Sequence, residues 1–503
     1  MPVKLGYSAL VDKFSLQVPP MRQTFVMGER STNTIVQAPD GTQRVELRRG
    51  VTEADASTSE QLTFALKREE LNLAVLGALF EHAEVLAEIR DWLTGTPSSV
   101  YARKAGYLAE WLTGKEFDFK APAGVRRDPL LDEDKFMTGP PRHVPKWGLV
   151  NNLLGTREFS PLVRRTDKLA ALLGENLRDK VRQAVDNLQP EILRRAVDYL
   201  YLAETRSTYG IEDEVPDNNR AARFRQLLES AGEPGPLSEE LFASWQNRIV
   251  SSFSIERGYR QGQNWLSRAG RLRNIADFIP PPPGLVPSMM AGINEVAQMA
   301  ALNRLDPVVA AACAAFGFVF VHPFYDGNGR LHRFLIHHVL RQAGFTPEGV
   351  VLPISARMLS RIERYSQLLK GYSRPRTDLL NYQMDADSGT ILVTSPQPLW
   401  LYAYFDATEL CEFLLECAKY SVEVDLANEV RYLRAHDGAV RELEEWLDLP
   451  QSKMNTLIDV IVQNRGALSK NKRKMVEMLT DEQVGRIQEV VSRHFAEHIE
   501  SRT

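Results

Sequence analysis

An apolar segment in the second half of the chain is followed at once by a polar stretch that contains glycine. Val308 to Val321 is about 14 residues long and rich in alanine, shorter than the roughly 20 residues that a membrane helix needs. We therefore expect a buried helix. The stretch His322–Arg333, HPFYDGNGRLHR, comes next, and Leu331–Gln342 is spaced like a second helix. The pattern predicts two core helices joined by a tight loop, with the glycines at a helix N-terminus.

The loop contains the residue types of an anion site. Backbone N–H groups at a helix N-terminus lack partners within the helix, and the helix dipole favours negative charge there. Gly327 and Gly329 carry no Cβ, so their backbone can approach a phosphate closely. Arg330 and Arg333 lie three residues apart on one helical face, and two forked guanidiniums suit a polyphosphate.

Two further side chains of this stretch supply chemistry. Asp326 places a carboxylate beside the phosphates, as in magnesium sites that use one or two protein ligands. His322 precedes the loop, where a neutral imidazole can take a proton from an incoming hydroxyl. The combination predicts phosphoryl or nucleotidyl transfer. Three competing motifs are excluded: the chain has no GxxxxGK[ST] and no HExxH, and an EF-hand loop from Asp326 would need Asp or Asn where Arg330 stands.

These residues also match the motif HxFx[D/E]GNGRxxR of the Fic family at every specified position. The chain resembles Fic-family proteins from about Tyr201 to Arg376, and more loosely beyond. Most members with the full motif are protein AMP-transferases, so the resemblance implies transfer of AMP from ATP, with Mg²⁺, to a Ser, Thr or Tyr hydroxyl of a target protein. It implies His322 as general base and Asp326 as magnesium ligand. The related Doc kinases have lysine at the position of Gly329, so glycine favours AMP transfer over phosphate transfer.

The resemblance assigns nucleotide contacts as well. The amides of Gly327 and Gly329, with Asn328, are expected to bind the α- and β-phosphates. Arg330 and Arg333 are expected to hold the β- and γ-phosphates.

Outside the motif, the resemblance extends to the adenine and the target protein. Tyr365 resembles the aromatic residue beside the adenine, and Phe324 is expected to pack under the loop. The segment Gly258–Leu266 resembles the family's β-hairpin flap, which pairs with the backbone of the target. Its candidate target-binding residues are Gly258, Gln263, Asn264 and Trp265.

A second motif points to regulation. Thr208–Asp213, TYGIED, resembles the inhibitory motif [S/T]xxxE[G/N], whose glutamate pairs with the second motif arginine. Glu212 is therefore expected to pair with Arg333 and to block a productive γ-phosphate position. Asp213 departs from the pattern, which has Gly or Asn there. A rival match, Ser252–Arg257 with Glu256, runs into the flap, and one segment can hardly be both the blocking helix and the hairpin.

Two alternatives to an autoinhibited AMP-transferase stay open. One is an enzyme that removes AMP, with Glu212 orienting a water. The other is a DNA-binding regulator with a Fic sensor core. Leu447–Met454 and Gly466–Lys474 have the features of helix starts, and two such helices suit a winged-helix-like module. Its candidate phosphate contacts are Lys470, Lys472, Arg473 and Lys474; the plainer interpretation is a solvated basic helix start.

The predicted fold class is mainly α: a Fic-type helical core with a small β-hairpin flap, a mixed α/β N-terminal region and a helical C-terminal module. The N-terminal region has β-like pieces at Arg22–Met27 and Arg44–Arg48, a turn at Asp40-Gly41 and helical spacing from Ser59 to Leu112. A further hairpin-like piece is Thr390–Thr394. The expected parts are residues 1–160 (mixed), 161–240 (with the inhibitory helix), 241–376 (Fic core) and 377–503 (C-terminal module).

Composition limits the partners. The chain of 503 residues has 61 basic and 65 acidic residues and a net charge of −4, so bulk charge gives no reason to expect a nucleic-acid or membrane partner. Cys313, Cys411 and Cys417 are too few for a disulfide framework, and the first residues lack the apolar stretch of a secretory signal. We expect a cytoplasmic protein; a homo-oligomer stays open.

Overall fold

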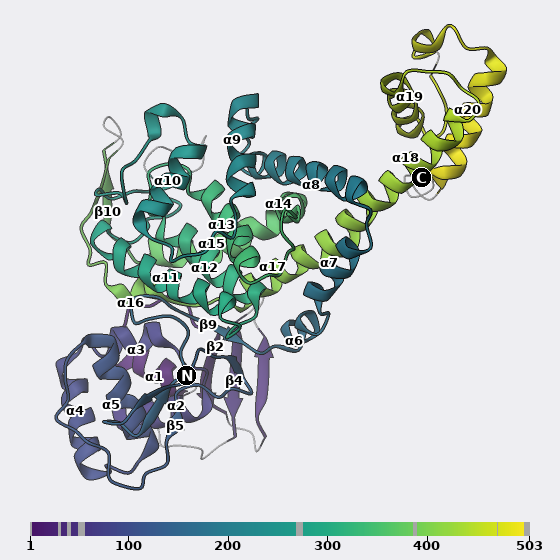
Figure 1. Cartoon of the computed structure of the whole chain (residues 1–503). Coiled ribbons are helices and arrows are strands. Elements are labelled where there is room, and N and C mark those ends of the chain that lie inside the picture. The colour runs from purple at the N-terminus through teal and green to yellow at the C-terminus, as the bar shows by residue number, and fades with distance from the viewer. Residues whose placement is uncertain are drawn as a thin grey trace. The chain divides into compact units, whose positions relative to one another are not determined.

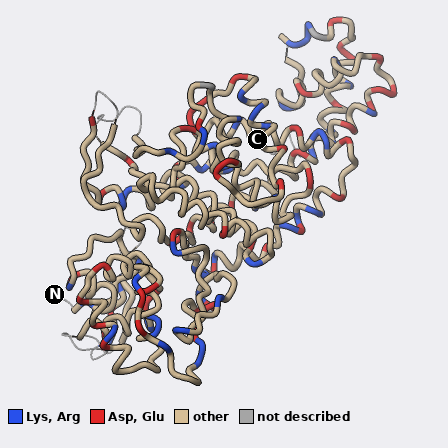
Figure 2. Tube along the Cα trace, turned by 60° about the vertical axis from the view of Figure 1, so that its left-hand side comes forward, with Lys and Arg blue, Asp and Glu red and all other residues tan. Residues whose placement is uncertain are grey.

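The computed structural model describes residues 3–28, 32–37, 42–48, 56–267, 275–385, 390–469 and 471–496. The chain forms two compact units. The first consists of Met1–Glu175, Thr208–Phe345 and Met358–Glu416, and the second of Asn176–Ser207, Thr346–Arg357 and Cys417–Thr503. Helices are the main regular secondary structure of both, and the strands are short (Figure 1), so the mainly α prediction is confirmed. Basic and acidic residues are interspersed along the chain (Figure 2).

A small sheet opens the first unit. Its strand order is β1-β2-β4-β3, with β1 Lys4–Leu5, β2 Gln23–Met27, β3 Thr34–Gln37 and β4 Gln43–Leu47. Strands β2 and β4 are parallel, and β3 pairs antiparallel with β4. Both predicted β pieces are therefore confirmed as strands. The predicted turn at Asp40-Gly41 lies outside the described residues.

Helix α1 lies between β1 and β2, and helices α2 to α5 follow the sheet, as the spacing of apolar residues from Ser59 to Leu112 predicts. The second helix begins with a capping box, in which the Ser57 side chain and the Glu60 side chain each accept the other's backbone N–H. The helices are α1 Gly6–Lys13, α2 Thr58–Arg68, α3 Leu73–Leu79, α4 Ala83–Gly95 and α5 Val100–Thr113. Short strands come next: β5 Asp128–Pro129, β6 Phe136–Met137, β7 Arg142–Val144, β8 Leu149–Asn151 and β9 Ser160–Arg164. Strand β9 pairs antiparallel with β6 and parallel with β12, Tyr404–Asp406.

The centre of the first unit is the helix pair α12, Pro307–Val321, and α13, Asn328–Gln342. The Asp306 side chain caps α12, and from Val308 to Val321 every residue except Val319 is buried. The two predicted core helices are confirmed. Around them lie α6 Asp167–Leu173, α9 Asn218–Glu229, α10 Glu239–Ile249, η1 Ser252–Ser254, η2 Pro283–Leu285, α11 Val286–Ala301, α15 Ile362–Thr377, α16 Leu399–Ala403 and α17 Thr408–Tyr420.

Two predicted hairpins have different outcomes. The piece at Thr390–Thr394 does form one, because β10 Tyr382–Met384 pairs antiparallel with β11 Ile391–Val393. The flap segment Gly258–Leu266 contains no strand; its only ladder contact within the described residues is one antiparallel bridge between Leu266 and Phe278. Residues 268–274 lie outside the described residues.

The second unit is helical throughout its described residues. Its elements include α7 Leu177–Asp186, most of α8 Pro190–Gly210, part of α14 Ile354–Ser360, the π-helical turn η3 Ser421–Leu426, α18 Ala427–Glu444, α19 Gln451–Gln463, η4 Arg473–Val476 and α20 Asp481–His494. An apolar cluster that includes Leu443, Ile458, Ile461 and Ile487 joins α18, α19 and α20. No described helix of the chain is long and apolar enough to span a bilayer.

One predicted helix start in this unit is wrong. The last helix does not begin in Gly466–Lys474 but at Asp481, where Thr480 and Gln483 form a capping box. Arg473 instead donates to the carbonyls of Val476 and Leu479. A basic cluster is unfavourable at a helix N-terminus, because the helix dipole repels cations there. Lys470 lies outside the described residues, Lys472 and Lys474 are exposed, and DNA contact stays a prediction.

Candidate active site

The loop between α12 and α13 is closed by one buried amide. Asn328 is 2% exposed; its Oδ1 accepts from Phe324 N at 3.1 Å and its Nδ2 donates to Phe324 O at 2.8 Å. Phe324 itself is fully buried, as expected. The amide side chain of Asn328 is thus used within the loop, and its expected contact with the α- and β-phosphates stays a prediction.

A positive φ requires glycine at position 327 of the loop, and the missing Cβ at Gly329 leaves room for the Glu212 side chain. Gly327 has φ +86°, and a Cβ there would lie 2.9 Å from Val250 Cγ1. A Cβ on Gly329 would lie 2.2 Å from Oε1 of Glu212. The intrahelical hydrogen bonds of α13 begin with Leu331 N donating to Gly327 O, so the three preceding N–H groups have no acceptor within the helix. The predicted amide nest is therefore present in the backbone.

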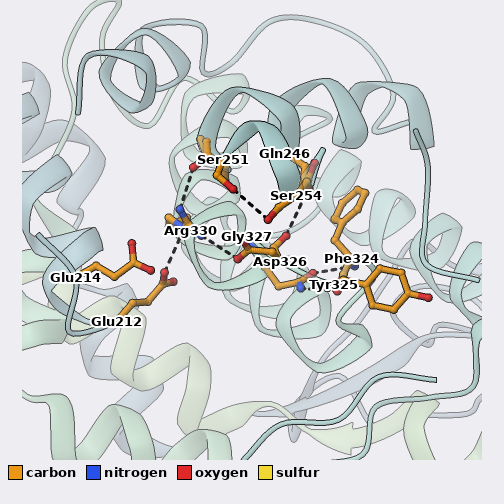
Figure 3. A network of polar contacts seen from close by, with 12 residues as sticks. Glu212, Glu214, Gln246, Ser251, Ser254, Phe324, Tyr325, Asp326, Gly327 and Arg330 are labelled. Atoms are coloured by element: carbon orange, nitrogen blue, oxygen red, sulfur yellow. Dashed lines mark hydrogen bonds and ion pairs between the residues drawn. The ribbon is translucent and has the colours of Figure 1, made fainter. Parts of the chain in front are cut away.

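A carboxylate already lies at this nest. Glu212 Oε1 is 2.5 Å from Arg333 Nη2. Glu212 Oε2 is 3.2 Å from Arg330 Nε (Figure 3). The arginine side chains are only 3% and 1% exposed. Arg333 also donates to Thr208 O at 2.9 Å. The structure thus brings Glu212 to Arg333, the pairing that the inhibitory motif predicts, and adds Arg330 to it.

The turn that carries Glu212 follows the end of α8. After Gly210, the backbone N–H groups of Glu212 and Asp213 donate to the carbonyls of Tyr209 and Gly210. Asp213 then adopts φ +56°, in the left-handed region that favours Gly and Asn. The helix therefore ends as the motif requires, although the residue at the turning point differs. Aspartate tolerates this conformation better than most side chains do.

Asp326 is the candidate metal ligand. Its Oδ1 accepts from Gly327 N at 2.6 Å and from Arg330 Nη2 at 3.0 Å, while the side chain is 46% exposed. Within the described residues, Oδ2 has no hydrogen-bond partner, and no group of three or more metal-ligating side chains occurs. A single open carboxylate beside a phosphate site fits Mg²⁺, which keeps several waters and phosphate oxygens as ligands.

His322 lies at the other end of the loop and is buried. It ends α12 with φ +52°, and its Nδ1 is 3.3 Å from Val319 O. Burial lowers the pKa of His322 to about 4, so the ring is neutral at pH 7. When Nδ1 carries the hydrogen and donates to Val319 O, the lone pair lies on Nε2. This is the state that a general base needs.

Two polar residues that the sequence patterns did not single out as loop supports hold the loop from outside. Gln246 of α10 is fully buried, and its Nε2 donates to Ser254 O at 2.8 Å and to Asp326 O at 3.4 Å (Figure 3). Glu256 accepts from Tyr325 N at 2.8 Å. Glu256, the rival inhibitory glutamate, therefore contacts the loop backbone. No sequence signal marks Gln246, because a polar residue in an amphipathic helix looks like a solvent-facing one.

The flap segment lies along the loop. Asn264 Nδ2 donates to Phe324 O at 3.3 Å, and Gln263 Nε2 donates to Pro280 O at 2.8 Å. These side chains bind backbone carbonyls, which explains the irregular course of the segment. Gly258 packs against Glu239 of α10, whose Oε1 a Cβ would approach to 2.3 Å. Trp265 is half-buried; target binding by these residues stays a prediction.

Tyr365, which is expected beside the adenine, is 4% exposed. Its ring stacks at 6.1 Å with His332 and at 6.2 Å with Phe413. Burial raises the pKa of Tyr365. The ring therefore packs in the core, and contact with an adenine stays a prediction.

Comparisons with known proteins agree with this geometry. Residues 236–340 match the model of the Fic/DOC family. The protein adenylyltransferase fic-1 of Caenorhabditis elegans is 36% identical over 93 residues, which is 18% of this chain and 18% of that protein. The protein adenylyltransferase Fic of Drosophila mojavensis is 37% identical over 83 residues, 16% of each chain. The chain thus spans less than a fifth of the length of these relatives.

Among solved structures, a Fic family protein from Desulfovibrio desulfuricans G20 is 20% identical, with a TM-score of 0.37. The alignment covers 65% of this chain and 89% of that one.

Proposed function

Because the chain carries a Fic domain at residues 236–340, we propose that it is a protein adenylyltransferase that moves AMP from ATP to a Ser, Thr or Tyr hydroxyl of a target protein. The observation that carries this proposal is the carboxylate of Glu212 between Arg330 and Arg333. An anion at the amide nest of α13 marks the place where a triphosphate fits. In the active state, the β- and γ-phosphates replace the carboxylate at these guanidiniums.

The proposed reaction uses His322 at one end of the loop and the charged residues at the other end. The target hydroxyl oxygen attacks the α-phosphorus of ATP, and Nε2 of His322 takes the hydroxyl proton. The bond between the α-phosphorus and the bridging oxygen breaks, and pyrophosphate leaves. Asp326 would hold Mg²⁺, which neutralises phosphate charge when bound. Arg330 and Arg333 neutralise the leaving pyrophosphate, and the first amides of α13 orient the α- and β-phosphates.

Regulation is part of the proposal. While Glu212 binds both arginines, it competes with the γ-phosphate for the same donors, so the chain is autoinhibited. Cys313, Cys411 and Cys417 are all buried, and so few cysteines support a reducing, cytoplasmic location.

The test compares Glu212→Gly with the unaltered protein, each incubated with Mg²⁺ and with ATP labelled at either the α- or the γ-phosphate. We expect Glu212→Gly to label itself faster, and only from the α-position. His322→Ala in the same background should lower labelling by about 10²–10⁴-fold. Labelling from the γ-position would show phosphate transfer instead. A loss of turnover in Glu212→Gly, together with AMP release from a modified target by the unaltered protein, would favour AMP removal.

A further inference from the structure

We infer that Arg260 is a positioning residue that fastens the flap segment to the general base, His322; the inference deepens the proposed function and rests on it. Arg260 lies in the flap segment Gly258–Leu266 and is only 2% exposed. No motif in the sequence marks it. Its side chain nevertheless reaches the C-terminal end of α12, where the general base lies.

The guanidinium of Arg260 binds four backbone carbonyls. Nε donates to His322 O at 2.8 Å, and Nη2 donates to Val321 O at 3.3 Å. Nη2 also donates to Pro281 O at 2.5 Å, and Nη1 donates to Gly262 O at 2.9 Å. One planar guanidinium therefore joins Gly262 of the flap segment and the backbone at Pro281 to the backbone of His322.

The backbone strengthens this junction. Arg260 N donates to Pro323 O at 2.8 Å, and Gly262 N donates to the Tyr325 hydroxyl at 2.7 Å. Two backbone N–H groups of the flap segment, at Arg260 and Gly262, thus donate to Pro323 and Tyr325 of the catalytic loop. Any shift of the segment that aligns the target also shifts the residue that takes the proton.

Electrostatics explains why this position suits arginine. Among the described residues, no carboxylate lies within ion-pair distance of Arg260. Burial lowers the pKa of Arg260 to about 10, so the side chain stays charged at pH 7. Two of its acceptors are the last carbonyls of α12, at the negative end of the helix dipole. The charge is therefore stabilised by carbonyl oxygens.

The conformation of His322 depends on this contact. The residue has φ +52°, a left-handed conformation that is unfavourable for a non-glycine residue. Arg260 holds the carbonyl of His322 in that conformation, and the imidazole then lies with Nδ1 toward Val319 O. Without the fork, the end of α12 is free to relax and Nε2 moves away from the incoming hydroxyl.

The experiment uses Arg260→Lys, which keeps the charge and loses the fork. Its matched control is Arg103→Lys: Arg103 is also 2% exposed and also binds backbone carbonyls, those of Trp147, Gly148 and Arg126, in the N-terminal helices. Both are made in the Glu212→Gly background. We expect Arg260→Lys to slow self-labelling by about 100-fold, with the affinity for Mg·ATP unchanged within about twofold, and Arg103→Lys to label at the parental rate.

A second readout does not depend on activity. In protein with ¹⁵N-labelled histidine, the His322 signal is assigned by its absence from His322→Gln. At pH 7 we expect the Nδ1–H tautomer in the parent and in Arg103→Lys, and a mixture of tautomers in Arg260→Lys. An unchanged tautomer with parental labelling in Arg260→Lys would overturn the inference, as would equal effects of both substitutions. If no variant labels at all, the proposed function fails, and the tautomer alone decides the role of Arg260.

Discussion

Arg333 and Glu212 are joined by a 2.5 Å hydrogen bond, and the second oxygen of the same carboxylate lies 3.2 Å from Arg330. One carboxylate is thus shared by two buried guanidiniums, of which Arg330 also pairs with Asp326. The contact that blocks the phosphate site therefore also stabilises the protein in the absence of nucleotide. Stability and activity should consequently change in opposite directions when Glu212 is replaced.

Replacing Glu212 by glycine should lower the free energy of unfolding by about 3 kcal/mol, because buried Arg333 loses the carboxylate of Glu212 and Arg330 keeps only that of Asp326. Mg·ATP should restore most of this loss, since a ligand at 100 times its Kd adds about 2.7 kcal/mol. Urea unfolding with and without Mg·ATP measures both effects. Glu214→Gln is the matched control: Glu214 pairs with Arg220 and does not contact the loop arginines. If Mg·ATP does not raise the free energy of unfolding of Glu212→Gly, Glu212 and the phosphates do not share one binding site.

Replacing Asp213 by glycine should strengthen inhibition. Asp213 adopts φ +56°, and glycine removes the steric cost of this conformation, about 1 kcal/mol. We expect a small rise in melting temperature and slower basal self-labelling. Asp213→Val should have the opposite effect on both, because a β-branched side chain is disfavoured at positive φ. Equal labelling by the glycine and valine variants would show that the turn does not control the position of Glu212.

Replacing Asn328 by alanine should destabilise the loop. The amide is buried and makes both a donor and an acceptor contact with Phe324, so its loss leaves backbone groups unsatisfied at a cost of about 1–3 kcal/mol. Urea unfolding measures the change. Asn328→Asp keeps the acceptor for Phe324 N and loses the donor, so it should also destabilise the protein. An aspartate variant as stable as the parent would mean that the bond to Phe324 O contributes nothing.

Acid should destabilise the protein through buried histidines, of which His338 offers the simplest test. Burial lowers its pKa to about 4, whereas the unfolded chain has the ordinary value near 6.5. Its contribution is therefore present above pH 6.5 and is lost as the pH falls toward 4, with a slope of up to about 1.4 kcal/mol per pH unit. His338→Phe should remove this slope, since the ring packs against Trp245 and Phe334.

Urea unfolding at several pH values between 4.5 and 7 gives the slope. The same substitution also removes the acceptor for Gly232 N, and that loss lowers stability equally at every pH. A pH dependence identical to that of the parent would show that His338 is protonated as readily in the folded protein as in the unfolded chain.

Local sequence determines the two core helices α12 and α13 and the loop between them. The apolar run before His322, the glycine at position 327 and the caps at Asp306 and Thr480 act on their near neighbours in the chain. The ends of α12 and α13, the loop between them and its free backbone amides therefore follow from the spacing of residues along the chain. The expected last helix start failed at Gly466–Lys474 because basic residues there suggested a helix, while the cap that begins α20 lies further along the chain.

Contacts between distant segments were decided only when the chain folded. Gln246 and Arg260 each contact the loop from another part of the sequence. The sequence alone does not indicate which backbone carbonyl a polar side chain will bind. Tyr365 resembles a nucleotide contact by sequence, and only the fold shows that its ring is buried and stacks with His332 and Phe413. Sequence thus determined which groups stand next to each other along a helix or turn, since those distances are set by backbone geometry. Tertiary structure decided which buried charges form pairs. Only close packing excludes water from a charged group, and a charged group without water needs a polar or oppositely charged partner.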